Sequence, residues 1–185
     1  MDTEKLSKRV FVGIKVSTPL AEYCAALQSC VAGEHVRLIP SEDMHLTLVT
    51  PWNTTDERAV IQRLQDALRN TKPFSLTLDR LACGPNNDSP KLLWIECAAS
   101  PELVALERIL ADAFDIPEHR PFIPHITIAR CAKDDQERSM PHHIAQRVEF
   151  SMTVDAVQLF LSPEQGGVGY TILASIPLLQ EDIVS

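Results

Sequence analysis

The sequence predicts an α+β fold: a bilobal molecule with two antiparallel sheets, helices outside and a central cleft. Two observations carry this prediction. Strand-like and helix-like stretches are mixed along the 185 residues, and several strand-like stretches follow one another without a helix between them. A four-residue pattern also occurs twice, once in each half of the chain. With no linker-like segment in evidence, we expect a single two-lobed domain over residues 1–185.

Strands are expected where apolar residues alternate or form short runs bounded by turn residues. The first, at 9–16, places valines and Ile14 on one face and Phe11 with Gly13 on the other. The remaining strands are expected at 36–39, 45–49, 74–81, 92–97, 124–129, 151–161 and 170–178. The stretch 84–90, rich in Gly, Pro and Asn, is the strongest loop signal between them.

Helices are expected where an apolar stripe follows a proline or a capping residue. They span 19–32, about 53–70 and 100–114. The polar stretch 132–146 is predicted as a helix that is interrupted near Pro141.

Composition and charge narrow the function. The chain is 45% hydrophobic but has no apolar run near the roughly 20 residues needed to span a bilayer, and its first residues form no secretory signal. We therefore expect a cytoplasmic protein with no membrane partner. A net charge of -8 disfavours an extended nucleic-acid footprint but allows a short oligonucleotide end in a local basic pocket. Five cysteines without a C-x-x-C pair indicate reduced thiols.

The repeated pattern is His-aliphatic-Thr-aliphatic. It reads His-Leu-Thr-Leu at 45–48 and His-Ile-Thr-Ile at 125–128, and both copies lie in predicted strands. Because successive residues of a strand point to opposite faces, each histidine shares a face with its threonine while the aliphatic residues face the core. Two such strands side by side would present two imidazoles and two hydroxyls to one volume.

That set of groups suits a phosphodiester. One neutral imidazole can take a proton from the attacking water, and the other, protonated, can give one to the leaving oxygen. The hydroxyls of Thr47 and Thr127 can donate to the non-bridging oxygens. A single H-x-T could be merely structural, but two polar residues on one face of each strand would make a poor core.

Three further residue assignments depend on what surrounds the repeat. Arg130 lies five positions after His125, so on an uninterrupted strand it would point away, and the sequence alone favours a surface arginine. Phe11 faces the cleft if the aliphatic face of its strand is core; it could stack on a base or simply pack against a helix. The close pair His142-His143 has no matching Cys or Asp pattern, so we expect no metal and no cofactor.

The two motifs resemble those of the two-histidine phosphoesterase superfamily, and within it the RNA 2′,3′-cyclic phosphodiesterases, also called the 2′-5′ RNA ligase family. The most specific match is 120–130, Arg-Pro-Phe-Ile-Pro-His-Ile-Thr-Ile-Ala-Arg, and the likeness covers nearly the whole chain. One departure is the stretch 49–52, Val-Thr-Pro-Trp, where the family usually has an aromatic-Leu-Gly segment. We expect that wall of the cleft to differ.

The resemblance implies a metal-independent enzyme that opens 2′,3′-cyclic phosphates to 2′-phosphomonoesters, with reversible 2′-5′ joining of RNA ends as a further activity. It makes Arg130 a phosphate ligand, His125 the base and His45 the acid. The expected partners are short RNA or oligonucleotide ends or cyclic nucleotides, bound by a monomer. The alternatives are a related enzyme acting on a small cyclic nucleotide or 2′-5′ oligoadenylate, and a non-catalytic RNA-end binder.

Overall fold

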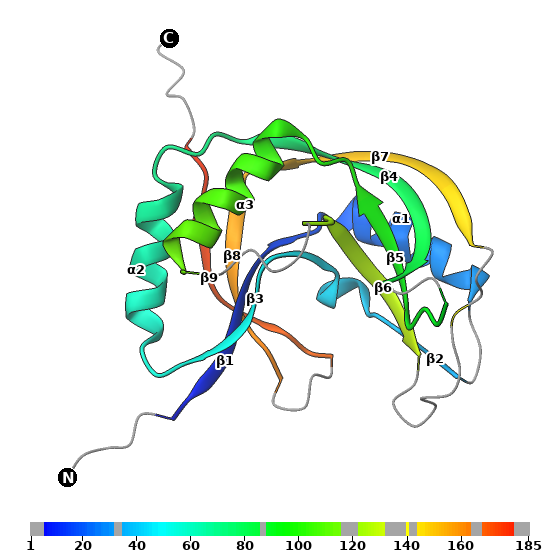
Figure 1. Cartoon of the computed structure of the whole chain (residues 1–185), viewed down its shortest axis with the longest axis horizontal. Helices are drawn as coiled ribbons and strands as arrows, with labels where there is room; N and C mark the ends of the chain where they lie inside the picture. Colours follow the sequence, from blue (N-terminus) through cyan, green and yellow to red (C-terminus); the bar gives the residue numbers. More distant parts are fainter. Residues whose placement is uncertain are drawn as a thin grey trace.

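The computed structural model describes residues 6–31, 35–85, 88–115, 122–131, 140, 144–163 and 168–179. Within these residues, nine strands form one sheet in the order β7-β4-β5-β6-β3-β1-β8-β9, with β2 added beside β6 (Figure 1). The strands are β1 (Lys8–Lys15), β2 (Val36–Leu38), β3 (His45–Thr54), β4 (Phe74–Gly84), β5 (Leu92–Cys97), β6 (His125–Cys131), β7 (Ala145–Val154), β8 (Ala156–Leu161) and β9 (Thr171–Pro177). The strand pairings in the described residues are all antiparallel.

The sheet has two halves that meet at the repeated motif. One half contains β2 and β4–β7, and the other contains β1, β3, β8 and β9. The register that joins them is Leu46 of β3 opposite Ile126 of β6, and both side chains are fully buried. The aliphatic residues of the two motifs therefore lie together in the core, which places the histidine and threonine of both motifs on the opposite face.

Three α-helices and two short 3₁₀ turns complete the described structure: α1 (Thr18–Leu27), η1 (Gln28–Cys30), η2 (Ser41–Asp43), α2 (Glu57–Leu68) and α3 (Pro101–Ala113). The Asp56 carboxylate accepts from the backbone N–H of Ala59 at the start of α2, and the Ser100 hydroxyl does the same for Leu103 at the start of α3. Figure 1 shows α2 and α3 side by side; α2 packs on β9, α3 on β3 and β4, and α1 on β7.

The α+β class and the three predicted helices are confirmed, but the prediction of two separate sheets is wrong. The two halves share one sheet because β3 and β6 are hydrogen-bonded neighbours, a pairing between residues far apart in sequence. The expected strand 151–161 is divided at Asp155 into β7 and β8, and residues 145–146 of the expected 132–146 helix belong to β7. Residues 132–139 and 141–143 of that segment lie outside the described residues.

No helix among the described residues is long and apolar enough to cross a membrane. The five cysteines are unpaired; Cys24 and Cys97 are buried, and burial raises the pKa of each thiol to about 12.

Candidate active site

The residues of both motifs surround one small pocket where the two halves of the sheet meet. The pocket has a volume of about 110 Å³. Its lining comes from η2 and the strands β3, β5 and β6, with one residue from the segment after β2 and one from the segment before β9: Ile39, Asp43, His45, Thr47, Leu92, His125, Thr127, Arg130 and Tyr170. The structure thus brings together His45, Thr47, His125 and Thr127, which the repeated motif indicated, and Arg130, which the family resemblance indicated.

The two imidazoles are held in the same way. Nδ1 of His45 lies 2.6 Å from the carbonyl oxygen of Asp43, and Nδ1 of His125 lies 2.7 Å from the carbonyl oxygen of Ile123. A carbonyl can only accept, so Nδ1 carries the hydrogen in both rings. Nε2 of each neutral ring is then unprotonated and has no protein partner among the described residues, so it can accept a proton, and it can donate one when the ring is protonated.

A bulge in β6 turns Arg130 toward the pocket. Leu93 pairs with Ala129 and Trp94 with Thr127, so Ile128 is an extra residue on β6. Ile128 and Ala129 both face the core, and the strand resumes its alternation with Arg130 on the histidine side. The spacing argument from the sequence, which pointed Arg130 away, fails because it assumed an uninterrupted strand.

The bulge is held in place by a buried glutamine. The carbonyl oxygen of Ile128 accepts hydrogen bonds from the backbone N–H of Ile39 at 2.9 Å and from Nε2 of Gln28 at 2.8 Å. The same amide group of Gln28 also donates to the carbonyl of Ile39 at 2.7 Å. Gln28 is one of the few buried polar side chains in the described part of the chain. Its two hydrogen bonds hold the segment after β2 against the bulge.

The first motif carries a matching bulge. Val12 pairs with Val49 and Gly13 with Thr47, which leaves Leu48 as the extra residue on β3. The two copies therefore share a strand bulge as well as the four-residue pattern. Thr50 takes the position that Arg130 has in the second copy, but it does not line the pocket. Among the described residues, the pocket between the histidines therefore has one arginine where a perfect repeat would give two.

Aromatic rings support His45. The ring of Phe11 lies 4.8 Å from the His45 ring and stacks on Phe160 at 4.7 Å, and Tyr170 meets His45 edge-on at 4.9 Å. Phe11 does lie on the site face of β1, but only 1% of its surface is exposed. This burial favours the packing alternative for Phe11 over stacking on a base, because these neighbours already cover most of its ring.

Asp43 positions two of these groups at once. Its backbone carbonyl accepts from His45, and its buried carboxylate accepts from the backbone N–H groups of Gly169 at 2.6 Å and Tyr170 at 3.0 Å. One residue thus ties the orientation of the imidazole to the position of the tyrosine beside it. The sequence showed Asp43 only as part of a turn; the signal missed is that it lies two residues before a motif histidine, as Ile123 does.

His125 rests on a different set of neighbours. The Trp94 ring centroid lies 4.3 Å from that of His125, and its indole N–H donates to Glu96 at 3.3 Å. Glu96 faces His125 across β5 and β6 and also accepts from Arg80 at 2.7 Å. An added Cβ on Gly84 would clash with the Trp94 ring, so only glycine leaves space for this indole.

Burial lowers the pKa of both catalytic candidates. For His45 the positive charges of Arg130 and His125 lower it further, while the bond to the Asp43 carbonyl and the Asp43 carboxylate oppose the shift. For His125 burial is again the largest cause, Arg130 acts in the same direction, and the Ile123 carbonyl and Glu96 oppose it. Both imidazoles therefore favour the neutral form more than a free histidine does.

A second pocket, of about 260 Å³, adjoins the first and shares His45, Thr47, Arg130 and Tyr170 with it. Its other lining residues are Arg9, Phe11, Pro51 and Ser162. Pro51 belongs to the 49–52 stretch that departs from the family pattern, so the departure does fall on a wall of this site. The combined cavity has room for a phosphate and the group attached to it.

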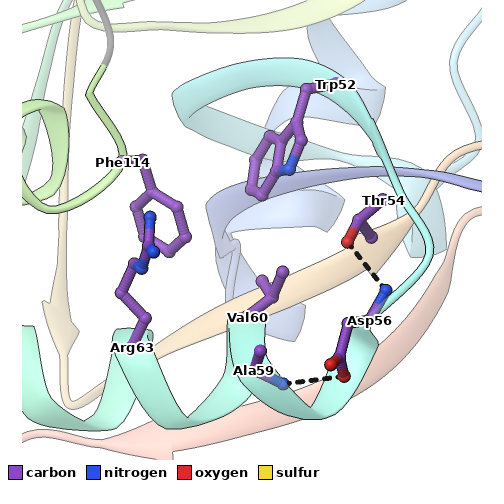
Figure 2. A pocket seen from close by; sticks show the side chains of 7 residues that line it. All are labelled: Trp52, Thr54, Asp56, Ala59, Val60, Arg63 and Phe114. Carbon is purple, nitrogen blue, oxygen red and sulfur yellow. Dashed lines mark hydrogen bonds between the residues drawn. The ribbon is translucent and has the colours of Figure 1, made fainter.

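A larger pocket, of about 370 Å³, lies elsewhere, between the end of β3, α2 and the end of α3 (Figure 2). There Trp52 packs 5.2 Å from Phe114, and the guanidinium of Arg63 lies 5.9 Å from the centre of the Phe114 ring. Its polar groups are used structurally, since Asp56 caps α2 and Arg63 also donates to the Ala113 carbonyl. No histidine is among the described residues that line it, so we place the chemistry in the smaller pocket.

Among the described residues, no group of three or more His, Cys, Asp or Glu side chains is arranged to hold a metal ion. His142 and His143 lie outside the described residues.

Comparison with known proteins identifies the family. The model of the 2′-5′ RNA ligase superfamily matches residues 16–165, and the chain belongs to this superfamily. A protein of Bacillus pumilus (strain SAFR-032), provisionally named a phosphoesterase, is 29% identical over 127 residues, which are 66% of this chain and 72% of that protein. A similarly named protein of Bacillus mycoides (strain KBAB4) is 26% identical over 71% of this chain and 76% of its own length.

Solved structures share the fold. The protein TT0787 of Thermus thermophilus superposes with a TM-score of 0.75 at 22% identity, covering 92% of this chain and 97% of that one. E. coli LigT, crystallised with NADP⁺, gives a TM-score of 0.72 at 25% identity, covering 95% of this chain and 100% of LigT. Membership of the superfamily supports a phosphoesterase or 2′-5′ RNA ligase type of activity for this chain.

Proposed function

We propose that this protein hydrolyses the 2′,3′-cyclic phosphate at the end of an RNA or oligonucleotide and produces a 2′-phosphomonoester. The observation that carries the proposal is the arrangement of His45 and His125. Each ring gives its Nδ1 hydrogen to a backbone carbonyl, so each Nε2 is available beside a pocket that also holds two threonines and one arginine. A proton acceptor and a proton donor on one small anion-sized pocket are what phosphodiester hydrolysis requires.

The proposed reaction requires only water and the two histidines. Nε2 of His125 takes a proton from water as the water oxygen attacks phosphorus. The bond from phosphorus to O3′ breaks, and Nε2 of His45 gives its proton to O3′, leaving a 2′-phosphate and a 3′-hydroxyl. The assignment of base to His125 and acid to His45 rests on the family resemblance.

Thr47, Thr127 and Arg130 would hold the phosphate during these steps. Their hydroxyls and guanidinium line the same pocket as the imidazoles, where hydrogen bonds to non-bridging oxygens strengthen as negative charge develops. The adjoining pocket lined by Arg9, Pro51 and Tyr170 would take the nucleoside. Structures of the related E. coli LigT with phosphate and with 3′-AMP support a phosphate-plus-nucleoside ligand.

The second candidate is a related enzyme on a small cyclic nucleotide or a 2′-5′ oligoadenylate. The compact cavity favours it, because the two adjoining pockets together are of the size of a single nucleotide. The reverse reaction, 2′-5′ joining of RNA ends, is a further candidate that the superfamily's description supports.

A substrate panel tests the proposal. Purified protein with EDTA is offered 2′,3′-cyclic nucleotides, oligonucleotides with cyclic ends and 2′-5′ oligoadenylate, and products are identified by mass and by chromatography against 2′-phosphate and 3′-phosphate standards. We expect cyclic ends to open to 2′-phosphates at a rate that EDTA does not change. Turnover of 2′-5′ oligoadenylate alone would favour the second candidate, and binding without turnover of any substrate would favour a non-catalytic RNA-end binder.

A further inference from the structure

Arg37, in the short strand β2, lies directly opposite Arg130. The register of β2 and β6 pairs Val36 with Cys131, Arg37 with Arg130 and Leu38 with Ala129. Directly opposed residues of antiparallel strands point to the same face, with Cβ atoms about 5 Å apart. Arg130 faces the phosphate pocket, so Arg37 faces the same side. Ile39, two residues after Arg37, lines that pocket and agrees with this orientation.

This pair of arginines has no acidic partner among the described residues. Within the part of the chain that the structure describes, no carboxylate forms an ion pair with Arg37 or with Arg130. Like charges directly opposite each other on a sheet are destabilising. An anion bound between or beside the two guanidinium groups would relieve that repulsion.

A second arginine pair in the same sheet provides the contrast. Arg80 of β4 lies opposite Arg147 of β7, but there each arginine has a carboxylate of its own. Arg80 bonds to Glu96 at 2.7 Å, and Arg147 lies 3.7 Å from Glu149. The Arg37–Arg130 pair therefore differs in its lack of acidic partners among the described residues, in a protein whose net charge is -8.

Arg37 also lies just outside the pocket that is proposed to hold the reacting phosphate. It does not line the pocket that holds the two histidines, although its neighbours Ile39 and Arg130 do. Its side chain is half-buried and remains accessible from outside. A ligand group held by Arg37 must therefore project from the pocket rather than sit between the imidazoles.

We propose that Arg37 forms a second phosphate subsite, which binds the phosphodiester next to the reacting end and makes the preferred substrate an oligonucleotide rather than a cyclic mononucleotide. This inference rests on the proposed function for the identity of the reacting end. Two phosphates, one at Arg130 and one at Arg37, agree with the short footprint that an acidic protein allows. Arg37 is a specificity residue in this scheme and takes no part in proton transfer.

The test compares two substrates that share the reacting end. They are cytidine 2′,3′-cyclic phosphate, with one phosphate, and a trinucleotide that ends in the same cyclic cytidine. For Arg37→Gln we expect kcat/KM on the trinucleotide to fall roughly tenfold, mainly through KM, from loss of one charge-assisted hydrogen bond. The cyclic mononucleotide should be cleaved as by the wild type. The control Arg147→Gln, on an exposed strand position, should change neither.

The salt dependence of trinucleotide binding distinguishes a phosphate contact by Arg37 from a purely structural role, because only the loss of a phosphate contact changes it. The logarithm of trinucleotide affinity should fall less steeply with the logarithm of salt concentration in Arg37→Gln, by about 0.7 in slope for one lost single-strand phosphate contact. Thermal stability should not decrease, since a like-charge pair is removed. Equal losses on both substrates, or no loss on the trinucleotide, would overturn the subsite.

A failure of the proposed hydrolysis can be distinguished from a failure of the Arg37 subsite. If the wild type opened neither cyclic end, the same variants would be compared for binding of a trinucleotide ending in a 2′-phosphate, by calorimetry over a range of salt. A smaller salt slope in Arg37→Gln would then support the subsite without the reaction. An unchanged slope would overturn it.

Discussion

Leu46 and Ile126 face each other across β3 and β6, and this buried pair connects the two halves of the sheet at the centre of the repeat. Each is the second residue of an H-x-T motif. Their pairing fixes the register of the two strands, so that a shift of either strand by one residue would turn its histidine into the core. The packing of the aliphatic residues is thus what places the polar residues in one pocket.

The bulge that turns Arg130 toward the site should depend on Gln28. Gln28→Met keeps the length of the side chain but removes the amide that donates to the carbonyls of Ile39 and Ile128. We expect a loss of about 1–3 kcal/mol in the free energy of unfolding and a lower kcat/KM, because the phosphate ligand is less well placed. Denaturant unfolding and kinetics on a cyclic end measure the two effects. The control is Gln62→Met on the exposed side of α2. Equal effects from both variants would contradict the prediction that Gln28 holds the bulge that orients Arg130.

Phe11 should behave as a core residue beneath His45. Phe11→Ala leaves a cavity against Phe160 and His45, and we expect it to cost about 3–5 kcal/mol of stability. Activity at a temperature where the variant is folded should fall alike for purine and pyrimidine cyclic nucleotides, since what changes is the support of the imidazole. A stable variant with a raised KM for purines only would restore the base-stacking role.

The pH dependence follows from the lowered pKa of both histidines. The active free enzyme has one neutral and one protonated imidazole, so kcat/KM should be bell-shaped with its maximum below about pH 6.5, the ordinary value for histidine. The anionic substrate favours the protonated form, so the profile of kcat should lie at higher pH than that of kcat/KM. Both limbs belong to the coupled pair. A flat kcat/KM profile between about pH 5 and 8 would contradict histidine acid–base chemistry.

Stability should change with pH in the corresponding direction. A histidine whose pKa is lower in the folded than in the unfolded protein binds protons preferentially when unfolded. Its contribution is fully present above the unfolded value of about 6.5 and is lost as the pH falls through the folded value. The melting temperature should therefore decrease on acidification below about pH 6.5, and less steeply in a His45→Asn variant.

The sequence predicted the class of fold and four polar residues around the pocket, those of the two H-x-T motifs, because strand alternation and a repeated motif are local signals. Arg130 shows where local signals end. Its direction depends on a bulge at Ile128 that Gln28 and Ile39 stabilise, and nothing in the spacing from His125 records that bulge. Only the family resemblance predicted that Arg130 faces the phosphate pocket.

Long-range contacts account for the other differences. The pairing of β3 with β6 made one sheet of the expected two, and it joins residues that are distant in the chain. Asp43 looked like a turn residue because the backbone N–H of Tyr170, from which its carboxylate accepts, comes from the opposite end of the sequence. Phe11 was correctly placed on the site face, but its burial depends on Phe160 and Tyr170, which the alternation of one strand does not reveal.

The most direct measurement is the single-turnover rate of His45→Asn and His125→Asn on the best phosphodiester of the substrate panel. Asparagine can still donate to the carbonyl of Asp43 or Ile123, but it lacks Nε2, so the pocket is kept and the proton transfer is lost. We expect each variant to be slower by at least about 100-fold, and the double variant to be little slower than either, because the two rings act as a unit. Melting temperatures measured alongside should show that both variants are folded. A folded His45→Asn or His125→Asn protein that cleaves at nearly the wild-type rate would contradict the paired-histidine mechanism.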